Sequence, residues 1–171
     1  MILYIVRHAI AEERDADRWP DDHERPLSDR GVKRFHPVAH MLARLVPDLD
    51  LLLSSRAVRA WSTAEMLTRI AGWPEPTPCH ELEGAESEAV CSAIRKNAGH
   101  ERIAIVGHEP SLSRLVGYLL TGSEHEVYLD FKKGAVVAVA FEGGVRNGMG
   151  VMQWMLTPKM ARLVGPSSSS S

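Results

Sequence analysis

The sequence predicts one α/β domain, a three-layer α/β/α sandwich whose sheet is mostly parallel with an antiparallel edge strand. Three observations predict this fold. Apolar, β-branched runs at 2–6, 49–55 and 102–107 are each followed by a stretch with helical spacing. Strands that alternate with helices form parallel sheets covered on both faces. Two last apolar runs, 134–141 and 151–156, are joined by a glycine-rich stretch typical of a hairpin.

The first third of the chain predicts a strand, a loop and a long helix. The run ILYIV is continuously apolar, as expected for a strand buried on both faces. The polar segment 12–26 is expected to form a loop, after which Ser28 can cap a helix. Pro37 lies inside that helix and is expected to kink or split it. The apolar residues of the helix recur at helical spacing: Val32, Phe35, Ala39, Leu42 and Val46.

The middle of the chain repeats the plan of a strand followed by a helix. After the second strand, a helix is expected over about 57–70, and it ends at Gly72. The stretch 75–86 is irregular, with a short strand expected at 77–80. Ser87 is then expected to cap a short helix.

The composition is that of an ordinary globular protein, with 171 residues of which 44% are hydrophobic and 25% are charged. This length suggests one domain, which we place at residues 1–164. The final GPSSSSS, residues 165–171, has nothing to pack and is expected to be disordered. The net charge of −2 argues against binding to nucleic acid, because no basic surplus is present to neutralise phosphates.

The two cysteines, Cys79 and Cys91, predict neither a disulfide framework nor a metal site. Both are expected to be buried fillers in a reducing compartment. No apolar run approaches the roughly 18 residues of a membrane span. We therefore expect a cytoplasmic protein that uses no membrane, metal or other cofactor. The remaining histidines show no metal-like spacing and are expected to be surface or capping groups: His23, His36, His40, His80, His100 and His125.

Three of the expected strands end on polar residues. The first strand ends at Arg7 and His8. The second runs into SSRAVR, which contains Arg56 and Arg59, and the third ends at His108. Ligands of α/β sheets bind outside the carboxyl ends of the strands. Guanidinium groups hold phosphate oxygens well, so the sequence predicts a pocket for a phosphoryl group.

A histidine in such a pocket can act as a nucleophile and carry the phosphoryl group covalently. The attacking nitrogen must be unprotonated, and nearby cations lower the pKa of an imidazole. Arg7 and Arg59 are therefore expected to keep His8 neutral and to stabilise charge on the transferring oxygens. Helices that begin near Ala57 and Ser111, with Ser111 as a cap, would add N-termini that favour anions.

These segments resemble the histidine phosphatase superfamily, which is named for an Arg-His-Gly motif. The matching stretches are RHA after the first strand, SSRAVRAWSTAEML after the second and VGHEP after a later one. The small size, RPLSDRG at 25–31 and QWMLTP at 153–158 resemble its SixA-type branch, the phosphohistidine phosphatases. The resemblance spans about residues 2–158 and implies the fold described above.

The resemblance implies a role for each matching residue. His8 becomes the transiently phosphorylated nucleophile. Arg7, Arg59 and His108 hold the phosphoryl group, and Arg25 lies in a segment that supports the site.

Two departures from the family pattern leave the second arginine open. Arg56 stands where the family usually has proline, and Ser62 replaces the usual glutamine. Helical spacing favours Arg59 for the phosphoryl contact, because it lies in the first turn of its helix. Arg56 is then expected to be an additional contact at the rim.

The proton donor is drawn from the segment HELEGAE, which offers Glu81, Glu83 and Glu86. Many superfamily members carry a glutamate in this part of the chain, and we choose Glu83. An alkoxide leaving group needs a proton donor, whereas an imidazole, with a reference pKa of ~6.5, leaves far more easily. A site with a weakly specified acid therefore favours phosphohistidine substrates.

The predicted activity is hydrolysis of phosphohistidine on a phosphotransfer-type protein, as in signal transduction, through a phosphohistidine intermediate and without a metal. The short segments 12–26 and 75–86 leave the pocket uncovered, which suits a side chain that projects from another protein. Two alternatives remain: a small-molecule phosphomonoesterase of the same superfamily, and a non-catalytic module that binds a phosphate or a phosphoprotein.

Overall fold

The computed structural model describes residues 1–164, and the predicted disordered tail at 165–171 lies outside the described residues. The strands are β1 (Ile2–Arg7), β2 (Leu51–Ser54), β3 (Thr77–Pro78), β4 (Arg102–Gly107), β5 (Val136–Ala140) and β6 (Val151–Leu156). The helices are α1 (Asp29–Leu45), α2 (Val58–Ala71), α3 (Ser87–Arg95), α4 (Ser111–Thr121) and α5 (Pro158–Val164), with short 3₁₀ turns η1 (Asp22–Glu24) and η2 (His80–Glu83).

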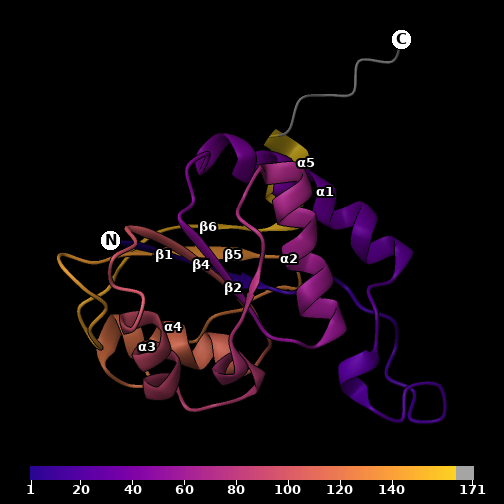
Figure 1. Cartoon of the computed structure of the whole chain (residues 1–171), viewed down its shortest axis with the longest axis horizontal. Helices are drawn as coiled ribbons and strands as arrows, with labels where there is room; N and C mark the ends of the chain where they lie inside the picture. Colours follow the sequence, from indigo (N-terminus) through magenta and orange to yellow (C-terminus); the bar gives the residue numbers. More distant parts are fainter. Residues whose placement is uncertain (165–171) are drawn as a thin grey trace.

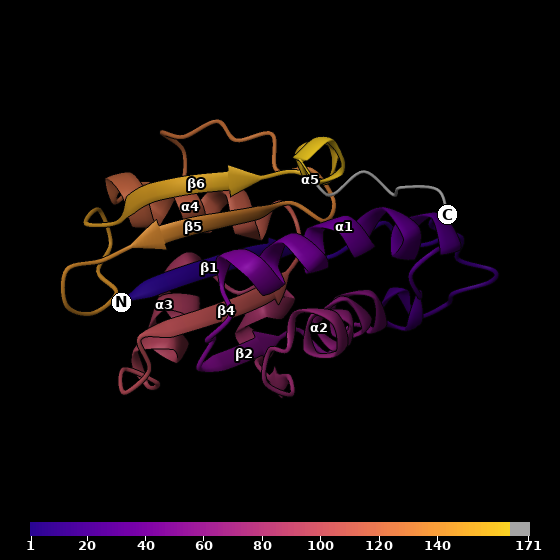
Figure 2. The same cartoon turned by 90° about the horizontal axis from the view of Figure 1, so that it is seen from above.

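The strands form one six-stranded mixed sheet in the order β3-β2-β4-β1-β5-β6, most of which is visible in Figure 2. β1, β2, β3 and β4 run parallel, whereas β5 is antiparallel to both β1 and β6. The predicted α/β class, with a mostly parallel sheet and an antiparallel edge strand, is confirmed.

Helices cover both faces of this sheet, with α1 and α2 on one side and α3 and α4 on the other (Figure 1). Alternate residues of β1 divide between the two cores. Tyr4 and Val6 pack with α1 and α2, whereas Leu3 and Ile5 pack with α3 and α4. All four side chains are at most 5% exposed, which explains why this strand is apolar without alternation.

The structure of helix α1 bears on two predictions, a cap at Ser28 and a kink or split at Pro37. The Ser28 cap is confirmed, because its hydroxyl accepts a hydrogen bond from the N–H of Gly31 at 3.1 Å. Of the two outcomes predicted at Pro37, a kink or a split, the split is wrong, since α1 continues through this residue from Asp29 to Leu45. The buried face of the helix, which includes Phe35, spans both sides of the proline and holds the two halves in one element.

The other helix ends differ from expectation by small amounts. Ser87 and Ser111 are the first residues of their helices, and their side chains do not act as the predicted caps. The carboxylate of Glu109 serves α4 instead, because it accepts hydrogen bonds from the N–H and the hydroxyl of Ser113, at 3.0 and 2.6 Å. Helix α5 was not predicted, although Pro158 at its first position is a common start signal.

Gly31 fixes the approach of α1 to the chain just after β1. A Cβ atom built at this position would overlap the backbone carbonyl of Ile10, which cannot move aside as a flexible side chain could. We expect Gly31→Ala to lower the free energy of unfolding by about 1–3 kcal/mol through overpacking. Urea titration measures this change. Gly99→Ala is the matched control, because nothing lies within 4 Å of its Cβ position, and an equal loss in both variants would contradict the close-packing account.

Candidate active site

The carboxyl ends of β1, β4 and β2 lie side by side, which brings the predicted site residues together. In the sheet register Arg7 pairs with Gly107, so the next residues, His8 and His108, are neighbours. The centres of their two imidazole rings are 5.0 Å apart. The segment 12–26, drawn in indigo, lies at the same end of the sheet (Figure 2).

His8 is held in one orientation by the backbone. Its Nδ1 lies 2.6 Å from the carbonyl oxygen of Ala9. Because that oxygen can only accept, Nδ1 must carry the proton, and Nε2 is left with its lone pair. The next backbone link is also fixed, since the N–H of Ala9 donates to the hydroxyl of Thr63 at 3.0 Å. His8 therefore presents Nε2 as the ring nitrogen with a free lone pair.

Both imidazoles are neutral over the ordinary pH range. Burial lowers the pKa of His8 to about 3, with smaller lowering contributions from His108, Arg59 and Arg7, while the Ala9 carbonyl acts in the opposite sense. Burial likewise lowers the pKa of His108 to about 4, assisted chiefly by Arg59. The arginines lower the pKa of His8, as predicted. Burial is the main cause of the shift, however, because an imidazolium loses its hydration in the protein interior.

These pKa shifts make stability depend on pH in a definite direction. The unfolded chain binds protons on these imidazoles below about pH 6.5, whereas folded His8 and His108 resist protonation until pH falls toward 3 and 4. The contribution of the two neutral imidazoles to the free energy of unfolding is complete above pH 6.5 and is lost as pH falls. We expect the free energy of unfolding to drop by about 2 kcal/mol per imidazole between pH 7.5 and 5. Urea titration at the two pH values measures the drop, and His8→Ala should lose about half of it. An unchanged drop in that variant would contradict the assignment.

Arg59 reaches the site from the first turn of α2. One Nη donates to the backbone carbonyl of Asp22 at 2.6 Å, and the other lies 3.1 Å from its carboxylate. The same carboxylate pairs with Arg25 at 2.9 Å, and this hydrogen bond is the main reason that the pKa of Asp22 is lowered. Arg25 therefore supports the site through Asp22, and it also donates to the carbonyl of Glu12 at 2.8 Å.

Arg7 and His108 are the other two predicted phosphoryl ligands. Arg7 donates to the carbonyl of Phe131, and His108 Nε2 lies 2.9 Å from the hydroxyl of Ser55. Within residues 1–164, four buried side-chain nitrogens have no hydrogen-bond partner: Arg7 Nε, Arg59 Nε, His108 Nδ1 and Trp19 Nε1. Buried polar atoms without partners are rare in folded proteins. Three of the four belong to predicted phosphoryl ligands, as expected where donors serve a bound anion.

A cavity of about 270 Å³ opens beside these residues. Its lining residues are His23, Arg59, Glu83, Gly84, His108, Glu109, Pro110 and Ser111. The structure therefore places Glu83 at the cavity, where its carboxylate accepts the backbone N–H of Arg56 at 3.2 Å.

The other acidic candidates lie elsewhere. Glu81 is engaged by the thiol of Cys79 at 3.3 Å, and Glu86 lines a separate small crevice. The side chain of Arg56 is exposed and does not line the 270 Å³ cavity. Of the three glutamates, the geometry favours Glu83.

Sequence reasoning missed several residues at the site. His23, taken as a surface group, lines the cavity beside His108. Asp22 pairs with Arg59 at 3.1 Å, and the positive charge of Arg59 contributes to lowering the pKa of Lys133. Asp22 and His23 belong to the loop 12–26, whose path no periodicity reveals. The only available signal was the dense Asp and Arg content of that loop.

The part of the chain that the structure describes holds neither a metal-ion cluster nor a helix that could span a membrane. Among residues 1–164, no group of three or more His, Cys, Asp or Glu side chains is placed to hold a metal ion. No helix in that part of the chain has the length and apolar character needed to cross a bilayer. Cys79 and Cys91 are buried without a disulfide, and burial raises the pKa of each thiol to about 11.

Comparison with known proteins gives a consistent result. Residues 3–86 match the family model of the histidine phosphatase superfamily (branch 1). The chain is 29% identical over 169 residues to an uncharacterized protein of Picosynechococcus sp., and the match covers 97% of both chains.

Solved structures share the fold at low sequence identity. The protein histidine phosphatase SixA complexed with tungstate matches with a TM-score of 0.80 and 24% identity, over 93% of this chain and 98% of that one. The alpha-ribazole phosphatase from Shigella flexneri matches with a TM-score of 0.68 and 19% identity, over 92% and 97% of the two chains. The segment that carries Arg7, His8 and Arg59 thus matches the histidine phosphatase superfamily, and the chain shares its fold with these solved structures.

Proposed function

We propose that this chain is a phosphohistidine phosphatase that acts on a protein substrate through a phosphorylated His8. The observation that carries the proposal is the hydrogen bond between His8 Nδ1 and the Ala9 carbonyl, at 2.6 Å. It leaves an unprotonated Nε2 on a ring whose centre lies 5.0 Å from that of His108, which lines the 270 Å³ cavity with Arg59, while Arg7 directly precedes His8 in the chain. These are the parts that phosphoryl transfer to a nitrogen nucleophile requires.

The reaction has two steps. The lone pair of His8 Nε2 attacks phosphorus, a P–N bond forms to His8, and the P–N bond of the substrate breaks with its electron pair on the departing imidazole. A water molecule then attacks phosphorus, and the electron pair of the second P–N bond returns to His8 Nε2. Arg7, Arg59 and His108 stabilise the charge on the phosphoryl oxygens in both steps.

Glu83 is the proposed proton donor and, in the second step, the acceptor of the water proton. Its role is modest for a phosphohistidine, because imidazole is a good leaving group. For an alkyl phosphate the same carboxyl group would have to protonate an alkoxide. This difference is why we favour a phosphohistidine over a sugar phosphate or an alcohol ester.

The form of the site supports a protein substrate. The 270 Å³ cavity is bordered by short segments, the 12–26 loop and the 75–86 stretch. A phosphorylated side chain on another protein can reach such a site. The structural neighbours include enzymes for a phosphorylated protein and for a small molecule, so likeness of fold alone does not choose between them.

The experiment compares substrates and traps the intermediate. The protein is incubated with free phosphohistidine and with glycerol phosphate, an alkyl phosphate, in the presence and absence of EDTA. We expect preferential release of phosphate from phosphohistidine, equal with and without EDTA. A ³²P-labelled phosphohistidine substrate, quenched in alkali, should leave acid-labile label on His8. Faster turnover of the ester would favour the phosphomonoesterase alternative, and binding without turnover would favour the non-catalytic module.

A further inference from the structure

A second, larger hollow is lined in part by Arg7 and Ala9, the residues on either side of His8 in the chain. It has a volume of about 580 Å³ and shares Arg7 with the phosphoryl site. We call it the cationic cavity. Its walls come from α1, from the loop before β5 and from α5, and its lining residues are Arg7, Ala9, Ile10, Gly31, Arg34, Phe35, Asp130, Lys132, Lys133, Gly134, Thr157, Pro158, Lys159 and Arg162.

Positive charge is concentrated in this lining. It holds six Lys or Arg side chains and one acidic residue, Asp130, which pairs with Lys132 at 2.7 Å. Among residues 1–164, no carboxylate lies within 4.0 Å of the charged groups of Arg34, Lys159 or Arg162. The whole chain carries a net charge of −2, so the excess of positive charge in this lining is local and does not reflect a basic chain.

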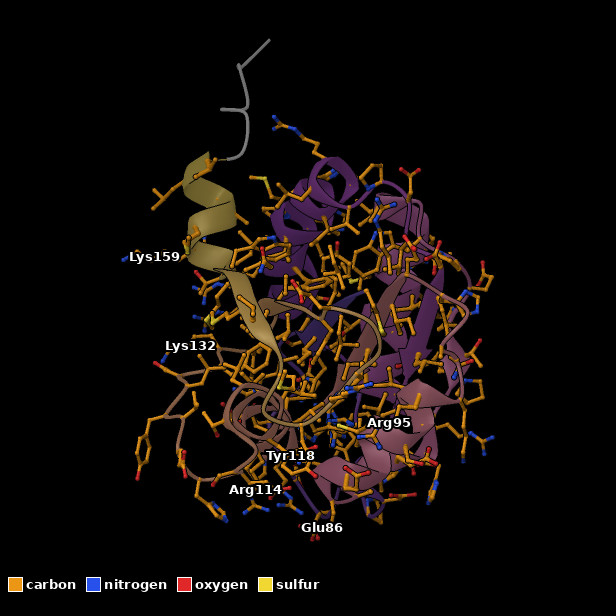
Figure 3. The ribbon with its side chains drawn as sticks, turned by 90° about the vertical axis from the view of Figure 1, so that its left-hand side faces the viewer. Glu86, Arg95, Arg114, Tyr118, Lys132 and Lys159 are labelled. Carbon is orange, nitrogen blue, oxygen red and sulfur yellow. The ribbon has the colours of Figure 1, made fainter. Side chains whose placement is uncertain are left out.

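These cations project outward from separate elements. Figure 3 shows Lys159 on α5 and Lys132 on the loop before β5, both directed to the same side of the molecule. Arg34, Lys159 and Arg162 are all exposed. Exposed cations on one side attract an acidic partner surface and orient it during approach.

The cationic cavity is linked to the phosphoryl site through Arg7, which lines the cavity and directly precedes His8. Lys133 lines the cavity, and its pKa is lowered first by burial and then by Arg7, Arg25 and Arg59. The same positive field therefore extends from the phosphoryl ligands to the outer cations. A partner that places a phosphohistidine on His8 would lay its neighbouring surface over this field.

We propose that the cationic cavity docks carboxylate side chains that flank the phosphohistidine of the protein substrate. This inference rests on the proposed function, because it names the class of protein that the same site selects. Acidic flanks pair with Arg34, Lys159 and Arg162, while the phosphoryl group binds at Arg7 and Arg59. The cations contribute to recognition of the substrate and take no part in the chemical step.

The test uses two synthetic phosphohistidine peptides of equal length. In one, the residues on both sides of the phosphohistidine include Asp and Glu, and in the other these are replaced by Asn and Gln. We expect kcat/KM of the wild-type protein to be about tenfold higher for the acidic peptide. The difference should lie in KM, because a few screened ion pairs strengthen binding by about this factor. The preference should shrink as salt is added.

Charge reversal then assigns the preference to the cavity. The variant Arg34→Glu/Lys159→Glu/Arg162→Glu should lose the preference for the acidic peptide, while its turnover of free phosphohistidine stays unchanged. The milder Arg34→Gln/Lys159→Gln/Arg162→Gln should retain part of the preference, which guards against misfolding of the reversal variant. The matched control Arg69→Glu/Lys96→Glu/Arg146→Glu makes the same change in charge at exposed residues outside the cavity lining, and it should keep the preference.

Two failures can be told apart. Equal kcat/KM for the two peptides in the wild-type protein, or an equal loss in the cavity and control variants, would overturn the docking proposal and leave the proposed activity standing. Failure to hydrolyse any phosphohistidine would instead overturn the proposed function. That second failure would also remove the docking proposal, which rests on the proposed function.

Discussion

His8→Ala is expected to lower kcat for phosphohistidine hydrolysis by at least about 10⁴-fold, because removal of a covalent nucleophile leaves only binding and electrostatic effects. Nothing nearby replaces it, since His108, the ring next to it, is oriented through Nε2 by Ser55. Phosphate release under saturating substrate measures the loss, and alkali-quenched protein should carry no acid-labile label.

The matched control for this variant is His100→Ala, a substitution of the same kind outside the cavity lining. It should retain wild-type kcat. Urea titration at pH 7.5 should show that His8→Ala is folded, so that the loss is chemical. If the variant kept more than a few per cent of wild-type turnover, His8 would not be the nucleophile, and the mechanism would have to be abandoned.

Arg59→Ala is expected to lower kcat by about 10²–10³-fold, which is the usual cost of removing one donor to the transferring oxygens. The guanidinium is nearly buried, with 10% of its side chain exposed, so its charge is weakly screened. The loss should appear in kcat more than in KM, because the charge on the oxygens changes during the reaction. Steady-state kinetics with free phosphohistidine separates the two constants.

Arg56→Ala provides the comparison within the same turn of the chain. Arg56 is exposed, and a rim contact of this kind should cost at most about threefold, expressed in KM. Arg59→Lys should recover part of the lost kcat, because a positive charge returns without the planar fork. Equal losses for Arg56→Ala and Arg59→Ala would contradict the choice of Arg59 as the phosphoryl ligand.

The sheet and the centre of the site could be predicted because both follow from strand patterns. The strands that end at Arg7 and Gly107 are apolar over their length, and parallel pairing places their ends together. The proximity of His8 and His108 is therefore a consequence of topology. Helix boundaries were predicted less well, because the caps at α3 and α4 depend on contacts such as the one between Glu109 and Ser113.

The outer parts of the site depend on contacts between distant segments. Asp22 meets Arg59 across 37 positions of the chain, and the loop that carries it has no periodic pattern. Lys133 precedes β5 and Arg162 follows β6, and both reach the cationic cavity because the start of β5 pairs with the end of β6. Charge is visible in the sequence at each of these residues, but its place in space is not. The dominant effect of burial on the pKa of His8 likewise needs the packed core.

One carboxylate, that of Asp22, lies among Arg14, Arg25 and Arg59, at 3.7, 2.9 and 3.1 Å. The protein thus supplies its own counterion to an arginine cluster that includes Arg59, one of the proposed phosphoryl ligands. Mutual repulsion among these guanidinium groups is offset before any substrate arrives, and Arg59 gains less from a second anion than an unneutralised arginine would. We expect neutralisation of Arg59 by Asp22 to lower the affinity for both substrate and inorganic phosphate. A lower affinity for phosphate favours release of the product after each turnover.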